Sequence, residues 1–396
     1  MKNLQDCSEA LEKVYEQYAT THDIAEDSEG SIDLTERRRL ESIYAASQWQ
    51  LIWRKFVRNR VALVGGIVIA MYYLAVLFAQ FIAPYSLTER FGKYIYLPPQ
   101  RVHFLHDGKF RPYVYDINLE IDEDLRKIYT PDLEKVIPIK FFVHGEPYKL
   151  LGLLETDIHL FGSDDGIVSI LGTDRQGRDM FSRILFGSQI SLTIGLVGVL
   201  LSLTFGSVLG VVSGYYGGRV DNLIQRLIEL VRSFPAIPLW MALSAAVPPH
   251  WPPLRTYFVV TLILSVIGWT WLARQLRGKV LSLRNEDYVL AAKLAGASDF
   301  RIIFRHLIPA TFSHIIVVST LAMPAMILAE TALSFLGLGL RPPITSWGVL
   351  LREVQNFQSI ALYPWVFTPA LAIAIAILAF NFLGDGLRDA SDPYTV

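Results

Sequence analysis

The residue types that carry catalytic or metal chemistry are present in this chain, but not in the spacings that such chemistry needs. Four histidines, at positions 103, 106, 144 and 159, match no metal-ligand pattern. Neither His-Glu-x-x-His nor Gly-x-Ser-x-Gly occurs. The Gly-Lys pairs at Gly92, Gly108 and Gly278 are followed by Tyr, Phe and Val, so none completes a phosphate-binding Gly-x-x-x-x-Gly-Lys-Ser/Thr loop. We therefore expect no catalytic residue, no metal site and no ATP hydrolysis by this chain itself.

Ionisable side chains inside apolar segments would indicate an ion or proton relay. Glu229 and Arg232 are three residues apart and are expected to pair. Glu330 and Asp385 lie near the ends of their apolar segments. This placement disfavours an ion-coupled secondary transporter, which stays open as the alternative of a different class.

A basic segment between two apolar runs, residues 274–306, has the pattern of two short helices. Asn285 is expected to cap the first helix and Gly296 to end it. Ser298 is expected to cap the second, and Pro309 suits the start of the next apolar helix. The face between the two helices is made of small residues: Ala291, Ala292, Ala295, Gly296 and Ala297. A compact helical pair of this kind suits insertion into a groove on a partner protein, although a connector lying on the inner membrane leaflet fits the same residues.

The elements that must position these segments are membrane helices. Of the 396 residues, 52% are hydrophobic and 18% are charged, and the formal net charge is -1. The mean hydropathy is +0.36. A single cysteine excludes a disulfide framework, and the charge balance gives no basic field for nucleic acid. Composition therefore indicates a polytopic membrane protein.

Apolar runs long enough to cross a bilayer predict six transmembrane helices. Five lie at 61–83, 190–216, 256–273, 307–329 and 359–384. The sixth begins near Ser233, is soon broken by Pro248 and Pro249, and must include the preceding turns that carry Arg226 and Glu229. The first run follows a long charged tail, so we expect it to be retained as an anchor and not removed as a signal.

Basic residues in the short flanks predict the orientation, because they stay on the cytoplasmic side. With the N-terminus inside, eighteen Lys and Arg residues fall on inner flanks, against Arg255, Arg341 and Arg352 outside. The resulting fold class is all-α, with both termini cytoplasmic and a small β-leaning extracytoplasmic insertion. The expected parts are a cytoplasmic tail (1–46), an interfacial amphipathic helix (47–60), a first transmembrane helix (61–83), the insertion (84–188), a five-helix core (189–384) that includes the cytoplasmic loop 274–306, and a cytoplasmic tail (385–396).

Small residues recur at every fourth position of the second apolar run. Such a stripe lets helix backbones approach closely, so we interpret it as helix packing and not as substrate binding. Its members include Gly206, Gly210 and Gly214.

Residues 288–309 resemble the EAA loop of binding-protein-dependent ABC importer permeases. The resemblance rests on the spacing from Ala291 and Ala292 through Gly296 to Pro309. Leu290 stands where the motif usually has an acidic residue, with Glu286 nearby.

Four further segments resemble the dipeptide/oligopeptide permease C subfamily, and together the matches cover most of the chain from Gln48 onward. Residues 171–183, Leu-Gly-Thr-Asp-Arg-Gln-Gly-Arg-Asp-Met-Phe-Ser-Arg, resemble its outer motif, and 213–218, 330–339 and 381–389 also match. This resemblance places five residues on the side that meets a binding protein: Gly172, Asp174, Gly177, Arg178 and Asp179.

The resemblance implies a type I ABC importer fold in a bacterial or archaeal inner membrane. It also implies the partners: a second homologous permease subunit, two ABC ATPase subunits or domains that bind the ATP and Mg²⁺, and an extracytoplasmic solute-binding protein. The residues it assigns to ATPase coupling are Ala291, Ala292, Gly296, Ser298, Asp299 and Pro309. Peptide is the expected cargo, and oligosaccharide or another small solute is the alternative.

Overall fold

The computed structural model describes residues 48–391, except residue 107 and residues 122–126. The expected tail at 1–46 and the end of the C-terminal tail lie outside the described residues. The chain divides into two units, 1–58 and 59–396. The described part of the first unit is helix α3 (Gln48–Arg58), in which the rings of Trp53 and Phe56 stack with their centroids 5.7 Å apart.

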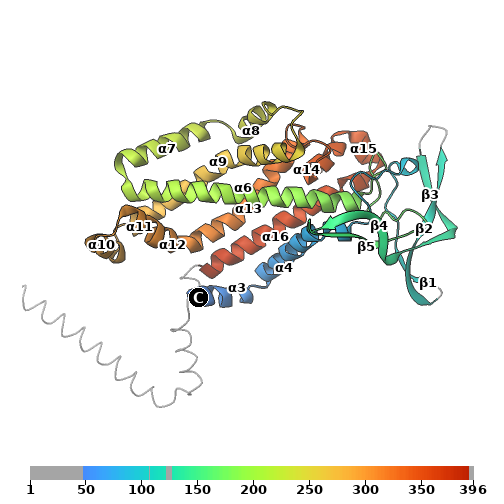
Figure 1. Ribbon diagram of the computed structural model, residues 1–396, viewed down its shortest axis with the longest axis horizontal. Helices are drawn as coiled ribbons and strands as arrows, with labels where there is room; N and C mark the ends of the chain where they lie inside the picture. The colour runs from blue at the N-terminus through green and yellow to red at the C-terminus, as the bar shows by residue number, and fades with distance from the viewer. Residues whose placement is uncertain (1–47, 107, 122–126, 392–396) are drawn as a thin grey trace, which may run out of the picture. The chain divides into compact units, whose positions relative to one another are not determined.

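Long apolar helices dominate the second unit (Figure 1). Among the described residues, five stretches are long and apolar enough to cross a membrane, and a sixth arises if α7 and α8 form one bent span. The main helices are α4 (Arg60–Leu77), α6 (Met180–Tyr216), α9 (Pro253–Leu283), α13 (Phe312–Phe335) and α16 (Thr368–Ser391), with the short α5 (Ala79–Ile82) after α4.

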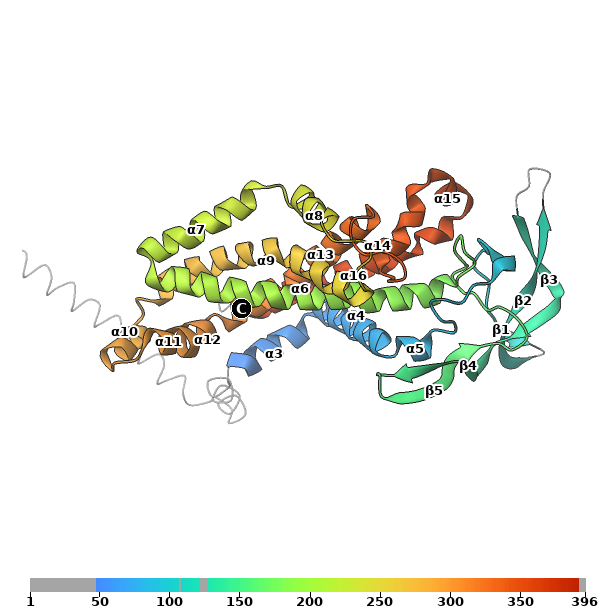
Figure 2. The same ribbon diagram turned by 45° about the horizontal axis from the view of Figure 1, so that its top comes forward.

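Helix α6 runs alongside α9 in both views (Figures 1 and 2), and small residues allow the close approach. A Cβ atom added to Gly206 would lie 2.8 Å from Trp269 O, and one added to Gly210 would lie 2.7 Å from Ala273 O. At Gly214 the same atom would lie 2.8 Å from a side-chain carbon. Larger side chains would therefore force the two helices apart.

The sixth apolar segment is bent, not straight. Helices α7 (Gly218–Ser233) and α8 (Ala236–Ala245) meet at 82°. Pro235 lies in the break, where its fixed φ and missing N–H end regular helix. The expected Glu229–Arg232 pair is wrong, because Glu229 Oε2 instead accepts from Arg226 Nη1 at 2.8 Å.

Residues 84–188 contain the β-structure that the short, proline-punctuated runs predicted. Strands β1 (His103–His106), β2 (Lys109–Ile121) and β3 (Lys127–Pro138) form an antiparallel sheet in that order. Strands β4 (Lys140–Leu150) and β5 (Leu154–Gly162) form an antiparallel hairpin. A 3₁₀ turn, η2 (Gly92–Tyr94), precedes the sheet.

Short helices connect α13 to α16 next to the start of α6. They are α14 (Trp347–Leu350), η4 (Leu351–Gln355), α15 (Phe357–Leu362) and η5 (Pro364–Phe367). Trp347 is fully buried, and its Nε1 donates to Ile184 O of α6 at 3.2 Å. The connection is therefore held against α6.

The basic loop differs from its expected bounds. Helix α9 continues ten residues past position 273 to Leu283, because Leu276 and Val280 are buried and Arg277 pairs with Asp221 of α7 at 2.6 Å. The remainder forms α10 (Asp287–Leu294), α11 (Asp299–Ile302), the π-helical turn η3 (Ile303–Leu307) and α12 (Ile308–Ala310). Pro309 thus lies in α12, and the next long helix begins at Phe312.

Candidate functional site

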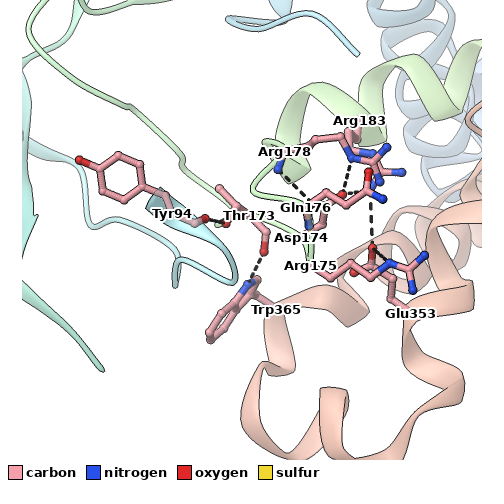
Figure 3. A network of polar contacts seen from close by, with 9 residues as sticks. All are labelled: Tyr94, Thr173, Asp174, Arg175, Gln176, Arg178, Arg183, Glu353 and Trp365. Carbon is pink, nitrogen blue, oxygen red and sulfur yellow. Dashed lines mark hydrogen bonds and ion pairs between the residues drawn. The ribbon is translucent and has the colours of Figure 1, made fainter. Parts of the chain in front are cut away.

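A buried ion network joins three separate parts of the chain at the N-terminal end of α6 (Figure 3). Its centre is Asp174, whose side chain is fully buried. Asp174 Oδ2 accepts from Arg178 Nε at 2.7 Å and from Arg183 Nη1. Arg183 is itself 95% buried, so the carboxylate offsets a charge that water does not reach.

The loop that contains Asp174 is a turn that the Asp174 side chain stabilises by accepting backbone hydrogen bonds. Asp174 Oδ1 accepts the N–H of Gln176 at 2.7 Å and the N–H of Arg178 at 2.9 Å, which is an Asx turn extended by one bond. Gly172 and Gly177 flank it with φ of 76° and 72°. A side chain on Gly172 would also collide with Trp365, 2.8 Å from the position of its Cβ.

Thr173 hydrogen-bonds this turn to two other segments of the chain, residues 94–97 and η5. Its N–H donates to Leu97 O at 2.9 Å, and its hydroxyl donates to Tyr94 O. Its carbonyl accepts from Trp365 Nε1 at 3.0 Å. The residues of η2, the turn and η5 are thus held in one arrangement.

Asp179 caps the N-terminus of α6. Its carboxylate accepts the N–H and the hydroxyl of Ser182, both at 2.7 Å, and the hydroxyl of Ser169 at 2.7 Å. Burial raises the pKa of the Asp179 carboxyl, and these hydrogen bonds oppose the rise. Its role is to begin the helix and fix the turn before it.

Glu353 of η4 approaches the same network from the other side. Its Oε1 lies 3.9 Å from Arg183 Nη1 and 3.9 Å from Arg175 Nε, which is too far for hydrogen bonds. Burial raises the pKa of the Glu353 carboxyl, and nearby Asp174 raises it further. A cavity of about 350 Å³ opens beside it, lined by polar side chains that include Arg175, Arg352 and Asn356.

A second cluster lies at the opposite end of α6, where α10 and α11 pack. Glu286, and not Asn285, is the N-cap of α10, and it makes no side-chain capping bond. Helix α10 ends in a Schellman motif: Gly296 N–H donates to Lys293 O and Ala297 N–H donates to Ala292 O, both at 3.0 Å. Gly296 has φ of 77°, which favours glycine there.

Ser298 caps α11 as predicted, accepting the N–H of Arg301 at 3.4 Å. The next residue, Asp299, accepts from the hydroxyl of Tyr215 in α6 at 2.7 Å. Lys293 Nζ lies 5.0 Å from the centroid of the Tyr215 ring. Buried side chains complete the attachment of the helical pair to α6 and α9: Val211, Val280, Val289, Ile302, Ile303 and Leu307.

The other face of the helical pair is exposed and apolar. Leu294 is 90% exposed and Phe300 is 71% exposed. Gly296 has no atom within 4 Å of an added Cβ, and Ala291 is also exposed. Exposed large apolar side chains beside small residues form a surface that a partner can cover.

A third polar cluster surrounds Glu330 inside α13. Its carboxylate is fully buried and accepts from the hydroxyls of Ser191 at 3.0 Å, Ser334 at 2.8 Å and Ser346 at 2.7 Å. Ser191 belongs to α6 and Ser346 precedes α14. This carboxylate therefore links α6, α13 and α14.

An apolar cavity of about 650 Å³ lies among α6, α9, α13 and the α7–α8 break. Its walls include Met326 and Trp271, with Arg232 at the break. The indole Nε1 of Trp240, another wall residue, has no hydrogen-bond partner. The cavity therefore offers a mainly apolar surface with one guanidinium group, that of Arg232.

The residues expected at the site thus form two groups. Asp174, Arg178 and Asp179 lie together with Gly172 and Gly177, and most of them are enclosed. The expected coupling residues lie at the other end of α6, in or next to α10 and α11 and, for Pro309, in α12, whose Ile308 packs against the same buried cluster. Among the described residues, no group of three or more His, Cys, Asp or Glu side chains is placed to hold a metal ion.

Sequence reasoning missed four residues that the structure brings to these sites: Arg183, Glu353, Leu294 and Phe300. Arg183 could have been found, because it belongs to the motif at 171–183 and follows Asp179 by four residues, which is about one helical turn. Leu294 and Phe300 could have been found as large apolar residues that flank the small ones. Glu353 had no local signal, because only the tertiary fold brings it within reach of position 183.

Two family models and several related proteins agree on the class of protein. The family described as "Binding-protein-dependent transport system inner membrane component" matches residues 206–395, and "N-terminal TM domain of oligopeptide transport permease C" matches 47–99. The chain is similar to the dipeptide transport system permease protein DppC of Bacillus subtilis, with 43% identity over 56% of this chain and 68% of that protein.

Two other relatives are similar at the same level. The oligopeptide transport system permease protein OppC of Bacillus subtilis is 38% identical over 56% of this chain and 70% of that protein. The glutathione transport system permease protein GsiD of Pectobacterium atrosepticum is 41% identical over 56% and 72%. A solved chain of the inward-facing MetNI methionine ABC transporter has a TM-score of 0.42 at 16% identity, covering 53% of this chain and 97% of that chain. From its family match and these relatives, the chain belongs to the inner-membrane components of binding-protein-dependent transport systems and is a multi-pass permease subunit of an ABC importer.

Proposed function

We propose that this chain forms half of a translocation pathway for peptides. Two of the relatives are named for dipeptide and oligopeptide transport, and a third is named for glutathione, itself a small peptide. Oligosaccharides or another small solute are the alternative cargo. The apolar cavity supports a peptide, since it offers apolar walls and, at the α7–α8 break, the Arg232 guanidinium, which can bind carbonyl or carboxylate oxygens.

The working assembly contains a second homologous permease subunit, two ABC ATPase subunits or domains, and an extracytoplasmic solute-binding protein. The ATPases bind the ATP and Mg²⁺, and this chain binds no cofactor. The chain has the type I importer fold with six spans, the α7–α8 pair being the bent one, and both termini are cytoplasmic. Alternating access follows when closure of the ATPases moves the α10–α11 pairs of the two permeases.

The observation that carries the ATPase contact is the exposed apolar face of α10–α11. Leu294 and Phe300 are exposed at the tip of a helical pair whose other face is fastened to α6. Burying one such side chain in a partner groove contributes about 2 kcal/mol. The two together would supply an anchor of the helix-in-groove kind, and the bond between Tyr215 and Asp299 would pass its movement to α6.

Gentle affinity purification from the native membrane, followed by mass spectrometry, tests the assembly. We expect ATPases, a second permease and a binding protein, together with any small molecule that the binding protein retains. A chain that is recovered alone and transports in proteoliposomes without ATP would overturn the proposal in favour of an ion-coupled carrier.

Aspartate substitutions test the ATPase contact. Leu294→Asp and Phe300→Asp should release the ATPases and abolish ATP-dependent uptake. Phe357→Asp is the matched control, because Phe357 is 81% exposed in α15 at the other end of the molecule. ATPase retention equal to that of the control would instead indicate that α10 and α11 lie on the inner leaflet.

A further inference from the structure

The polar cavity beside the ion network has the charges of an incomplete site. Arg175, Arg352, Glu353, Gln355, Asn356 and Tyr96 line it. The charged residues that line it carry two guanidinium groups, of Arg175 and Arg352, and one carboxyl group, of Glu353. Positive charge therefore exceeds negative charge.

Two of the guanidinium groups are available to a ligand. The Arg175 side chain is 65% exposed, and its pairing with Glu353 spans 3.9 Å. Arg352 is exposed and forms no ion pair within the part of the chain that the structure describes. Asn356 Oδ1 is occupied by the N–H of Gln358, which leaves the Asn356 amide group to donate. The cavity thus offers two guanidinium groups and one neutral amide donor to a ligand.

Buried atoms beside the cavity lack partners, which is uncommon in a purely structural network. Glu353, with its side chain 90% buried, has no partner for Oε2, and the same holds for Arg183 Nε and Gln176 Oε1. The wall residue Tyr96 has φ of 56°, a left-handed conformation that is strained for a residue with a side chain, and its ring stacks on that of Tyr363 with the centroids 3.9 Å apart. Unpaired polar atoms and backbone strain that gather at one place are typical of a binding site.

We propose that this cavity binds a carboxylate group. Arg175 and Arg352 hold the carboxylate oxygens, because the planar guanidinium fork matches that group, and Asn356 donates beside them. Glu353 lies on the wall of the same cavity, with its Oε1 3.9 Å from Arg175 Nε. The source of the carboxylate rests on the proposed function. It is either an acidic side chain of the solute-binding protein or the free C-terminus of the peptide that this protein delivers.

The test uses the assembled transporter in lipid nanodiscs and the binding protein purified with it. Arg175→Gln and Arg352→Gln should each weaken binding-protein affinity about tenfold, or about 1.4 kcal/mol. Arg175→Lys, which keeps the charge and loses the fork, should fall between. Arg111→Gln is the matched control, since it removes the same charge from an exposed position of β2 and should change affinity less than twofold.

Three states of the binding protein distinguish the two sources of carboxylate. It is used empty, loaded with a peptide that has a free C-terminus, and loaded with the same peptide amidated. Loss of affinity in all three states assigns an acidic side chain of the binding protein, whereas loss only with the free C-terminus assigns the peptide. Affinities equal to the Arg111→Gln control in all three states overturn the proposal.

A probe that needs no partner is acetate, compared with chloride at equal ionic strength. Acetate should raise the Tm of the unmodified chain, and Arg175→Gln with Arg352→Gln should abolish the rise. If the unmodified transporter binds no binding protein, the proposed function fails while acetate still tests the cavity. No rise in Tm with the unmodified chain would then overturn the carboxylate site as well. Both arginines are exposed, so the variants are expected to fold.

Discussion

Replacing Asp174 by Asn should destabilise the chain far more than the same change at an exposed ion pair. The Asp174 carboxylate is fully buried and accepts four hydrogen bonds, two of them from guanidinium groups. Asn keeps the shape of the side chain but loses the negative charge, and its NH₂ group would face N–H groups that are themselves donors. Breaking a buried ion pair from one side costs about 3–5 kcal/mol, because the remaining charge stays buried and uncompensated.

The matched control is Asp164→Asn. Asp164 accepts from Lys140 at 2.7 Å, but its side chain is 65% exposed, so its pair contributes less than about 1 kcal/mol. Tryptophan fluorescence during heating should show a Tm lower by roughly 3–10 °C for Asp174→Asn and little change for the control. Hydrogen exchange should rise at residues 172–183 in the first variant alone. Equal melting and equal exchange in the two variants would refute the role given to the network.

Three further predictions concern packing, charge and attachment. Gly210→Leu should cost about 1–3 kcal/mol through overpacking against α9, whereas Gly278→Leu, with open space around it, should not; equal Tm values would contradict this. Glu353→Gln should leave the Tm at neutral pH unchanged or higher, because burial raises the Glu353 pKa and so disfavours its ionised form. A clear fall in Tm would show instead that the 3.9 Å pairs of Glu353 stabilise the chain. Tyr215→Phe and Asp299→Asn should each speed hydrogen exchange in residues 287–302, and the double variant should add nothing; additive effects would mean that the two groups act separately.

The lengths of the apolar runs predicted the main helices, because a helix needs about 20 apolar residues to cross the lipid core. The same lengths misplaced the helix ends that other interactions determine. Helix α6 begins at Met180, ten residues before the uncharged run, because Arg183 is neutralised by Asp174. Helix α9 extends to Leu283 because Arg277 has a partner in Asp221. A charged residue therefore ends an apolar run in the sequence without ending the helix in the fold.

Local chemistry was the reliable part of the sequence analysis. Ser298 caps α11 and Gly296 ends α10, because a cap and a left-handed residue act within a few positions. The Asn285 cap was wrong because α10 begins at Asp287 behind Glu286, and boundaries shift by one or two residues when the cap makes no side-chain bond. Glu353 could not be predicted, since its contacts at position 183 depend on the whole connection from α13 to α16.

Helix α6 takes part in both clusters and so connects them physically. At its first turns Asp179 caps it and Arg183 ties it to Asp174, while at its last turns Tyr215 holds Asp299. Its 37 residues span about 55 Å, well beyond the roughly 30 Å of a hydrocarbon core. Close packing on α9 along the glycine stripe resists bending between the ends. We therefore expect a displacement of the α10–α11 pair to be transmitted along this stiff helix to the ion network, where the 3.9 Å pairs of Glu353 can rearrange more readily than a filled core.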